Sequence, residues 1–287
     1  MKLATKLALG AAGLGLIAGA PVVSATSGFD RDYDRGRHYE LSIVGLTDDQ
    51  RLVSFTETRP WRTRNLGTIS GLVDDTSVVG IDYRPATGDL YAVGDKGGVY
   101  TIGKGARATL RSRVNVPLQG TTFGVDFNPV VDRLRIVSDT GQNLRDNVDA
   151  DNDTLTDTTL TSPGPPPATL LGVAGALHQQ RRGPRHRHHA VRHRRGRRPG
   201  RDPVAGQRRP RRADRQAEVD AGPSVGFDIY SAVRNGSTVR IDAFAALTVG
   251  GSDALYEVSL FNGRARSLGP IGGKRPVVDI AIPLAQR

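Results

Sequence analysis

The chain has 287 residues, a formal net charge of +11, 37% hydrophobic residues and no cysteine. Without cysteine, neither a disulfide framework nor a thiol nucleophile can form. The excess positive charge is confined to Leu177–Glu218, which holds 15 of the 40 Lys and Arg residues, and the remainder of the chain is nearly neutral. The charge therefore describes one segment and does not by itself indicate a nucleic-acid-binding fold.

The first 25 residues have the features of an export signal. Lys2 and Lys6 precede an apolar run from Leu7 to Ala20, and Val23-Ser24-Ala25 follows as a cleavage motif of small residues. The apolar run is too short for a stable membrane span. We therefore predict a signal peptide at 1–25 and a polar linker at 26–40. The mature protein is expected to be secreted or held in the cell envelope, without a transmembrane anchor.

Short segments of alternating apolar and polar residues fill most of the chain from 41 to 284. Turn signals such as Asp95-Lys96-Gly97-Gly98 and Asn235-Gly236 separate them, and helical periodicity is absent. This pattern is typical of all-β sandwiches, barrels and propellers.

A four-residue motif, which reads Gly-Ile-Asp-Tyr in its first copy, recurs along this region and narrows the choice of fold. Copies begin at Gly80, Gly124 and Gly226, and a weaker copy begins at Val277. Gly175 opens another copy if the tract that follows is read in a shifted frame, so the spacings are 44 residues and then 51. A repeat of this size predicts the blades of a β-propeller. We predict about five blades. The last is closed by pairing the strand at Val277–Pro283 with strands near Leu41–Thr47, Arg51–Thr56 and Leu66–Leu72.

The motif also repeats an aspartate, at Asp82, Asp126, Asp228 and Asp279. One interpretation is a ring of acids that holds a hard cation through oxygen ligands. The other is that each aspartate accepts hydrogen bonds from the backbone amides of a turn in its blade. Repetition in every unit favours the structural interpretation, because a binding site needs asymmetry.

A second acidic cluster lies between Asp146 and Asp157. Asp149, Asp151 and Asp153 alternate and Asp157 follows, which resembles the front half of a calcium loop. The glycine at loop position six and the bidentate glutamate at position twelve are missing. We name these four aspartates as the candidate metal ligands, for Ca²⁺, and a polar hairpin loop is the alternative.

The aromatic residues allow a further pair of interpretations. Their alternation with Leu and Val favours core packing, and the alternative is a sugar-stacking surface made by Trp61, Tyr83, Tyr91, Tyr100, Tyr230 and Tyr256.

The Arg- and His-rich tract at 178–218 interrupts the third blade. It has no aromatic residue and no strand alternation, so we predict that it is disordered. Read one base later, with GC-rich codons, the segment from Leu177 to Glu218 decodes to strand-like runs such as TTLFDID and turn signals such as PTGK. We interpret it as a compensated frameshift.

Two segments, 78–102 and 122–145, closely resemble a bacterial family of secreted proteins known as domain of unknown function number 4394. The matching motifs include Arg84-Pro85-Ala86-Thr87-Gly88 and Phe127-Asn128-Pro129. The resemblance extends over about 41–177 and 219–284, and the written tract departs from it. It implies a propeller-like repeat fold in exported bacterial proteins, and it carries over no activity and no catalytic residues.

The scarcity of histidine argues against one common kind of catalytic site. Outside the tract the only histidine is His38, in the linker, which disfavours catalysis by an imidazole base. We predict a non-catalytic binding or interaction protein with an extracellular or envelope ligand, and we assign no catalytic or cofactor-binding residue. A metal-dependent propeller hydrolase or lactonase is the alternative, and polyanion binding through the tract is a third hypothesis.

Overall fold

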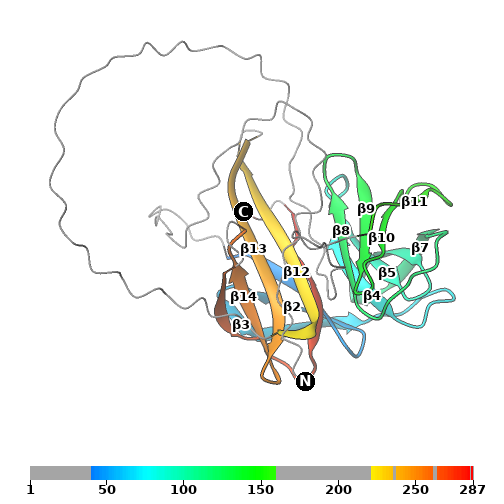
Figure 1. Ribbon diagram of the computed structural model, residues 1–287. Coiled ribbons are helices and arrows are strands. Elements are labelled where there is room, and N and C mark those ends of the chain that lie inside the picture. Colours follow the sequence, from blue (N-terminus) through cyan, green and yellow to red (C-terminus); the bar gives the residue numbers. More distant parts are fainter. Residues whose placement is uncertain (1–39, 160–220, 235–236, 261–263, 285, 287) are drawn as a thin grey trace, which may run out of the picture.

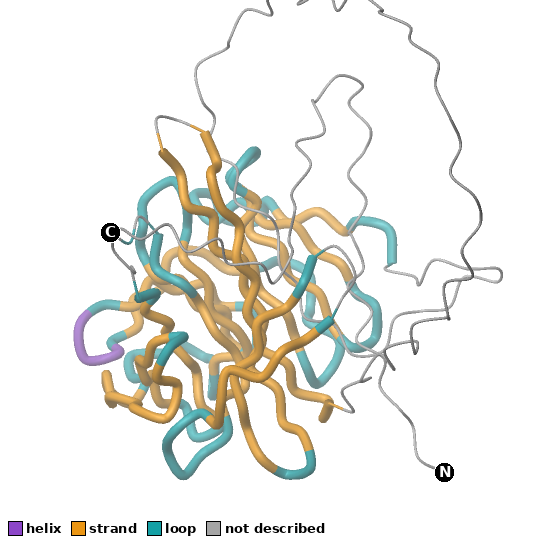
Figure 2. Tube along the Cα trace, turned by 90° about the vertical axis from the view of Figure 1, so that its left-hand side faces the viewer, coloured by secondary structure: helices purple, strands orange, loops and turns teal. Residues whose placement is uncertain are grey.

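The computed structural model describes residues 40–159, 221–234, 237–260, 264–284 and 286. The fold of these residues is all-β, with a single 3₁₀ turn, η1 (Lys104–Ala106), among the strands (Figure 2). The predicted signal peptide, the predicted linker apart from Glu40, and the tract at 178–218 lie outside the described residues.

The strands form four antiparallel sheets of four strands each (Figure 1). The first contains β16 (Val277–Ala281), β1 (Ser42–Thr47), β2 (Arg51–Thr56) and β3 (Arg59–Thr68). The second contains β4 (Val78–Tyr83), β5 (Leu90–Gly94), β6 (Gly98–Ile102) and β7 (Ala108–Arg113). The third contains β8 (Phe123–Asn128), β9 (Arg133–Ser138), β10 (Asn143–Asp146) and β11 (Thr154–Thr156). The fourth contains β12 (Ala221–Arg234), β13 (Ser237–Val249), β14 (Ser252–Val258) and β15 (Ala265–Pro270).

The sheets have the arrangement of propeller blades. The repeated motif supplies the first strand of each sheet, β4, β8, β12 and β16, and successive first strands contact one another. The predicted closure is confirmed, because β1 pairs antiparallel with β16 in a register that places Gly45 opposite Ile280.

The predicted count of five blades is wrong, since the described residues form four. The unit that was expected to begin at Gly175 falls among residues that the structure does not describe. The miscount arises because this unit was predicted from its spacing and from the frame-shifted reading of the sequence that follows Gly175. Its sequence runs into the Arg- and His-rich tract, which lacks the apolar alternation of the other units.

A repeated tight turn links the second and third strands of three sheets. The N–H groups of Asp48, Asp95 and Asp139 donate to the carbonyls that precede β16, β4 and β8. The third residue of each turn has a positive φ, which glycine adopts readily, and it is Gly97, Gly141 or, in the first sheet, Gln50. The turn therefore ties each hairpin to the first strand of its own blade, which explains why the D-x-G signal recurs in the sequence.

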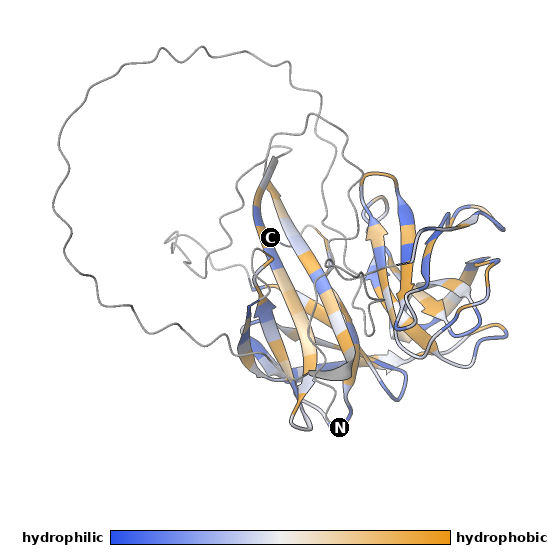
Figure 3. Ribbon diagram, in the orientation of Figure 1, coloured by the Kyte–Doolittle hydropathy of each residue, from blue (hydrophilic) through white to orange (hydrophobic). Residues whose placement is uncertain are grey.

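The hydrophobic core lies between the sheets. Apolar residues alternate along the strands, as Figure 3 shows, so each sheet offers an apolar side to a neighbour. One core cluster joins the sheet of β12 to that of β16, a second joins the sheet of β16 to that of β4, and a third joins the sheet of β4 to that of β8. The order of the four blades is therefore β12–β15, then β16 with β1–β3, then β4–β7, then β8–β11.

Candidate functional site

Three of the four repeated aspartates link neighbouring blades. Asp279 Oδ2 accepts a hydrogen bond of 2.8 Å from the N–H of Ile81 on the next blade, and its Oδ1 accepts from the N–H of Ile280 at 2.9 Å. Asp82 bonds Phe127 of the following blade and its own neighbour Tyr83 in the same manner. A carboxylate that accepts two backbone N–H groups gives a hydrogen-bond acceptor to donors that the hydrogen bonds between strands leave unpaired.

Asp228 repeats this arrangement at the third junction. Its Oδ2 accepts from the N–H of Ile282, just beyond β16, at 2.6 Å, and its Oδ1 accepts from the N–H of Ile229. The structure therefore supports the structural interpretation of the repeated aspartates at these three positions. The strands could be predicted from the sequence, but the contact between blades could not, because it depends on the stacking of separate sheets.

Asp126 is the exception among the four. It is 3% exposed, and its Oδ2 has no hydrogen-bond partner in the described part of the chain. Its carboxyl group shares a side-chain hydrogen bond with Asp82, which requires one proton between the two acids. A buried acceptor without a hydrogen-bond partner lowers the stability of the folded state by about 1–3 kcal/mol, so the unpaired oxygen of Asp126 destabilises the fold.

The four buried carboxyls have raised pKa values. Loss of hydration is the main cause for each, and the negative charge of Asp82 adds to it at Asp126. Burial raises the pKa of Asp228 from 3.8 to about 7, although two backbone N–H groups oppose the shift. Burial also raises the pKa of Asp279 well above its ordinary value. Burial therefore makes each of these four acids easier to protonate than an exposed aspartate.

The predicted calcium ligands lie on the β10–β11 hairpin and its flank, where arginines contact three of them. Asp149 accepts from Nη1 of the buried Arg84 at 2.8 Å and also from Nη2. Asp153 lies 3.9 Å from Nη2 of Arg133. Asp157 forms ion pairs with both Arg135 and Arg145, while Asp151 is exposed. Within the described ranges, no group of three or more acidic or histidine side chains is arranged to hold a metal ion. Calcium binding here stays a prediction.

Arg84 joins the second and third blades and was not singled out as a site residue. Its side chain is 6% exposed and forms a two-pronged contact with Asp132 in addition to Asp149. Its guanidinium also lies 5.9 Å from the ring centre of Tyr91. The hydrogen bonds from Arg84 lower the pKa of Asp149. The signal in the sequence was an arginine at a turn, followed one repeat later by loops rich in aspartate.

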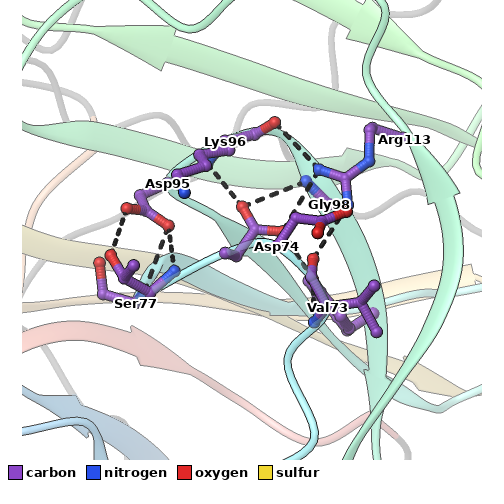
Figure 4. Close-up of polar contacts among 10 residues, drawn as sticks. Val73, Asp74, Ser77, Asp95, Lys96, Gly98 and Arg113 are labelled. Carbon is purple, nitrogen blue, oxygen red and sulfur yellow. Dashed lines mark hydrogen bonds and ion pairs between the residues drawn. The ribbon is translucent and has the colours of Figure 1, made fainter.

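A second polar cluster, centred on Asp75, was also missed. Asp75 Oδ2 accepts from the hydroxyl of Tyr100 at 2.6 Å, and Oδ1 accepts from the N–H of Lys96. Figure 4 shows this region, where Arg113 reaches the carbonyl of Val73. Burial raises the pKa of Tyr100 to about 12, which suits a fixed hydrogen-bond donor and not a proton-transfer group. The cluster therefore anchors the loop before β4.

The aromatic residues are divided between core and surface. Tyr91, Tyr100 and Tyr230 are buried, as the core interpretation predicted, and Tyr91 meets Phe127 edge-on at 5.1 Å. Trp61 on β3 is 52% exposed. The structure therefore brings together no sugar-stacking surface from the three buried rings. Among the described residues, no helix is long and apolar enough to cross a membrane.

One comparison with known protein families matches most of the repeated region. No match was found among curated proteins. The family described as domain of unknown function (DUF4394) matches residues 51–176 and 213–281. The match covers strands of all four sheets, and it stops just before the Arg- and His-rich tract and resumes near its end. The chain therefore belongs to the DUF4394 family.

Proposed function

We propose that the chain is an exported binding or interaction protein and not an enzyme. The observation that carries the proposal is the use of the buried acids, because Asp82, Asp228 and Asp279 each accept two backbone N–H groups and so hold blades together. These three carboxyls are buried and held by the backbone, so they are poorly placed to act as a general base on a substrate. The composition supports the same proposal, since the chain has no cysteine and, outside the tract, one histidine.

Export is the second part of the proposal, and it rests on the first 25 residues. Expression in a bacterial host, followed by N-terminal sequencing of the protein from the periplasm or medium, tests it. The expected mature N-terminus is Thr26. An uncleaved chain that remains in the cytoplasm would contradict export without touching the binding proposal.

A metal-dependent hydrolase or lactonase is the alternative that one observation favours. Buried carboxylate oxygens without a hydrogen-bond partner occur at Asp126 and Asp146 among the described residues, and such oxygens can ligate a cation. A screen of nitrophenyl esters and simple lactones, with Ca²⁺, Mg²⁺ or Mn²⁺, separates the two functions. We expect no turnover above that of heat-denatured protein. Metal-dependent turnover that is lost in Asp126→Asn or Asp146→Asn would establish the enzyme instead.

Polyanion binding through residues 178–218 is the third hypothesis. Binding of this kind rests on phosphate neutralisation and therefore weakens steeply with salt. Retention on immobilised DNA is compared between the full chain and a variant that lacks 178–218. We expect any retention to disappear with the tract, which would leave the binding function of the blades unaffected. Salt-resistant retention by the shortened chain would instead locate nucleic-acid binding on the blades.

A further inference from the structure

The single tryptophan of the chain, Trp61, lies on the surface. It is 52% exposed on β3, which is the outer strand of its sheet. A large aromatic side chain gains most from burial in a core, and an exposed tryptophan is typical of a surface that binds a partner. Core packing therefore does not account for this residue.

A bulge in β3 turns Trp61 and its neighbour toward solvent. Five steps along β3, from Arg59 to Arg64, face only two steps along β2. The extra residues form a bulge, which breaks the alternation of a regular strand and redirects side chains. Trp61 and Arg62 are consecutive and both exposed, which regular alternation over a covered sheet does not give.

The neighbouring blade fixes the backbone and ring of Trp61. The N–H of Gly272 donates to the carbonyl of Pro60 at 3.0 Å. A Cβ atom on Gly272 would lie 2.2 Å from the carbonyl oxygen of Trp61, so this close approach requires glycine. A Cβ atom on Gly269 of β15 would lie 3.8 Å from Cε3 of the indole, so the ring lies against the backbone of β15. The exposed ring is therefore held in place before a ligand arrives, which lowers the entropy cost of binding.

Basic side chains flank the exposed ring. Arg62 and Arg64 are exposed on β3, and neither forms an ion pair with an acid in the described part of the chain. Lys274 is exposed in the loop that follows β15. Arg59 differs, because Oε1 of Glu40 lies 3.7 Å from its Nε. We name Trp61, Arg62, Arg64 and Lys274 the Trp61 patch, and it offers unpaired cations beside an aromatic ring.

We propose that the Trp61 patch binds an acidic polysaccharide, such as a chain of uronate sugars. The C–H face of a sugar ring packs flat on an aromatic ring, whose face carries partial negative charge. A guanidinium group binds a carboxylate through two parallel hydrogen bonds. A protein partner fits less well, because the core of a protein interface is apolar over many residues and this patch has one apolar side chain.

The inference rests on the proposed function of an exported binding protein and names the chemistry of its partner. Because the chain has one tryptophan, its intrinsic fluorescence reports directly on the patch. The full chain is titrated with a galacturonate hexamer. We expect a saturable change in tryptophan emission at about millimolar concentrations or below. Cellohexaose, which has six sugars and no charge, and hexaglutamate, which has the carboxylates and no sugar ring, should each bind about tenfold more weakly.

Substitutions separate the patch from the basic tract at 178–218. Arg62→Gln should weaken hexamer binding about threefold, because it removes one charge-assisted hydrogen bond at an exposed position. Arg111→Gln also removes one exposed arginine, on β7, and as the matched control it should bind as the native chain does. Trp61→Ala should weaken binding about tenfold by calorimetry, because it removes the stacking ring. Circular dichroism of each variant establishes that it is folded.

Several results would overturn the proposal. They are no saturable change in emission up to about 10 mM hexamer, equal binding of the neutral hexamer, equal losses in Arg62→Gln and Arg111→Gln, and an unchanged affinity in Trp61→Ala. Equally tight binding of hexaglutamate would overturn it in favour of an acidic peptide, and equally tight binding of a thymidylate hexamer would do so in favour of single-stranded nucleic acid. The proposed function fails separately, by turnover in the substrate screen, so absence of hexamer binding leaves a non-catalytic protein with a different partner.

Discussion

The same substitution at the four repeated aspartates should give two different outcomes. Asparagine has nearly the shape of aspartate, but only one of its terminal atoms accepts a hydrogen bond. At Asp82, Asp228 and Asp279 both oxygens accept from backbone N–H groups. One of those donors would then face the NH₂ group of asparagine.

The magnitude follows from the burial of these contacts. A buried N–H left without an acceptor costs about 1–3 kcal/mol, and removal of a desolvated charge returns part of that cost. We expect Asp82→Asn, Asp228→Asn and Asp279→Asn each to lower the free energy of unfolding by about 2 kcal/mol. Asp126→Asn should stay within about 0.5 kcal/mol of the native chain, because Oδ2 has no described partner and the asparagine amide can donate to Asp82.

Urea unfolding followed by far-ultraviolet circular dichroism measures all four variants at one pH. The slope of the transition should not change, so that the midpoint alone reports the free energy. A loss at Asp126 equal to the losses at the other three would show that Asp126 has a strong partner in the folded chain. Native-like stability in all four would show that the links between blades contribute nothing.

Three other predictions concern the charged groups. Arg84→Ala should lower the free energy of unfolding in urea by about 3 kcal/mol, because Asp132 and Asp149 lose their partner and the contact with Tyr91 is removed. Arg51→Ala, which removes the exposed ion pair with Asp49, should lower it by less than about 1 kcal/mol. Equal losses in the two variants would refute this ranking. Burial raises the pKa of Asp228 from 3.8 to about 7 in the folded state. The stabilisation that results is complete below pH 3.8 and is lost as the pH rises to about 7, and its full size is about 4 kcal/mol. The free energy of unfolding should therefore be larger at about pH 5 than at about pH 8; a flat or opposite profile would contradict raised pKa values. Calcium should bind Asp149 and its neighbours only at about millimolar concentrations, and more tightly in Arg84→Ala, because that substitution frees Asp149 from its ion pair. Calorimetric titration measures calcium binding to the native chain and to the variant. No heat of binding from either protein would contradict the calcium prediction.

Local patterns in the sequence predicted most of the fold. Alternation marked the four first strands, and the glycine turns marked the hairpins, because both depend on residues close together in the chain. Closure by β1 and β16 followed from the need to cover sheet edges. The short strand β11, by contrast, carries only Thr154–Thr156 and offers too little alternation to recognise.

The candidate site was less predictable for a physical reason. Asp82 and Phe127 are 45 residues apart, and Arg84 and Asp149 are 65 apart, so their contacts depend on how whole sheets stack. The repeated aspartates were visible as a pattern, but nothing in the spacing distinguished Asp126 from the others. That distinction arises only because three aspartates meet a neighbouring first strand and one does not.

The account's central claim is that Asp82, Asp228 and Asp279 hold neighbouring blades together through backbone N–H groups. The most direct measurement is native-state hydrogen exchange of the assigned backbone amides. The amides of Ile81, Phe127 and Ile282 should exchange slowly in the native chain, and the amide of Phe127 should lose protection in Asp82→Asn. Fast exchange of these three amides in the native chain, or unchanged protection of Phe127 in Asp82→Asn, would contradict the claim.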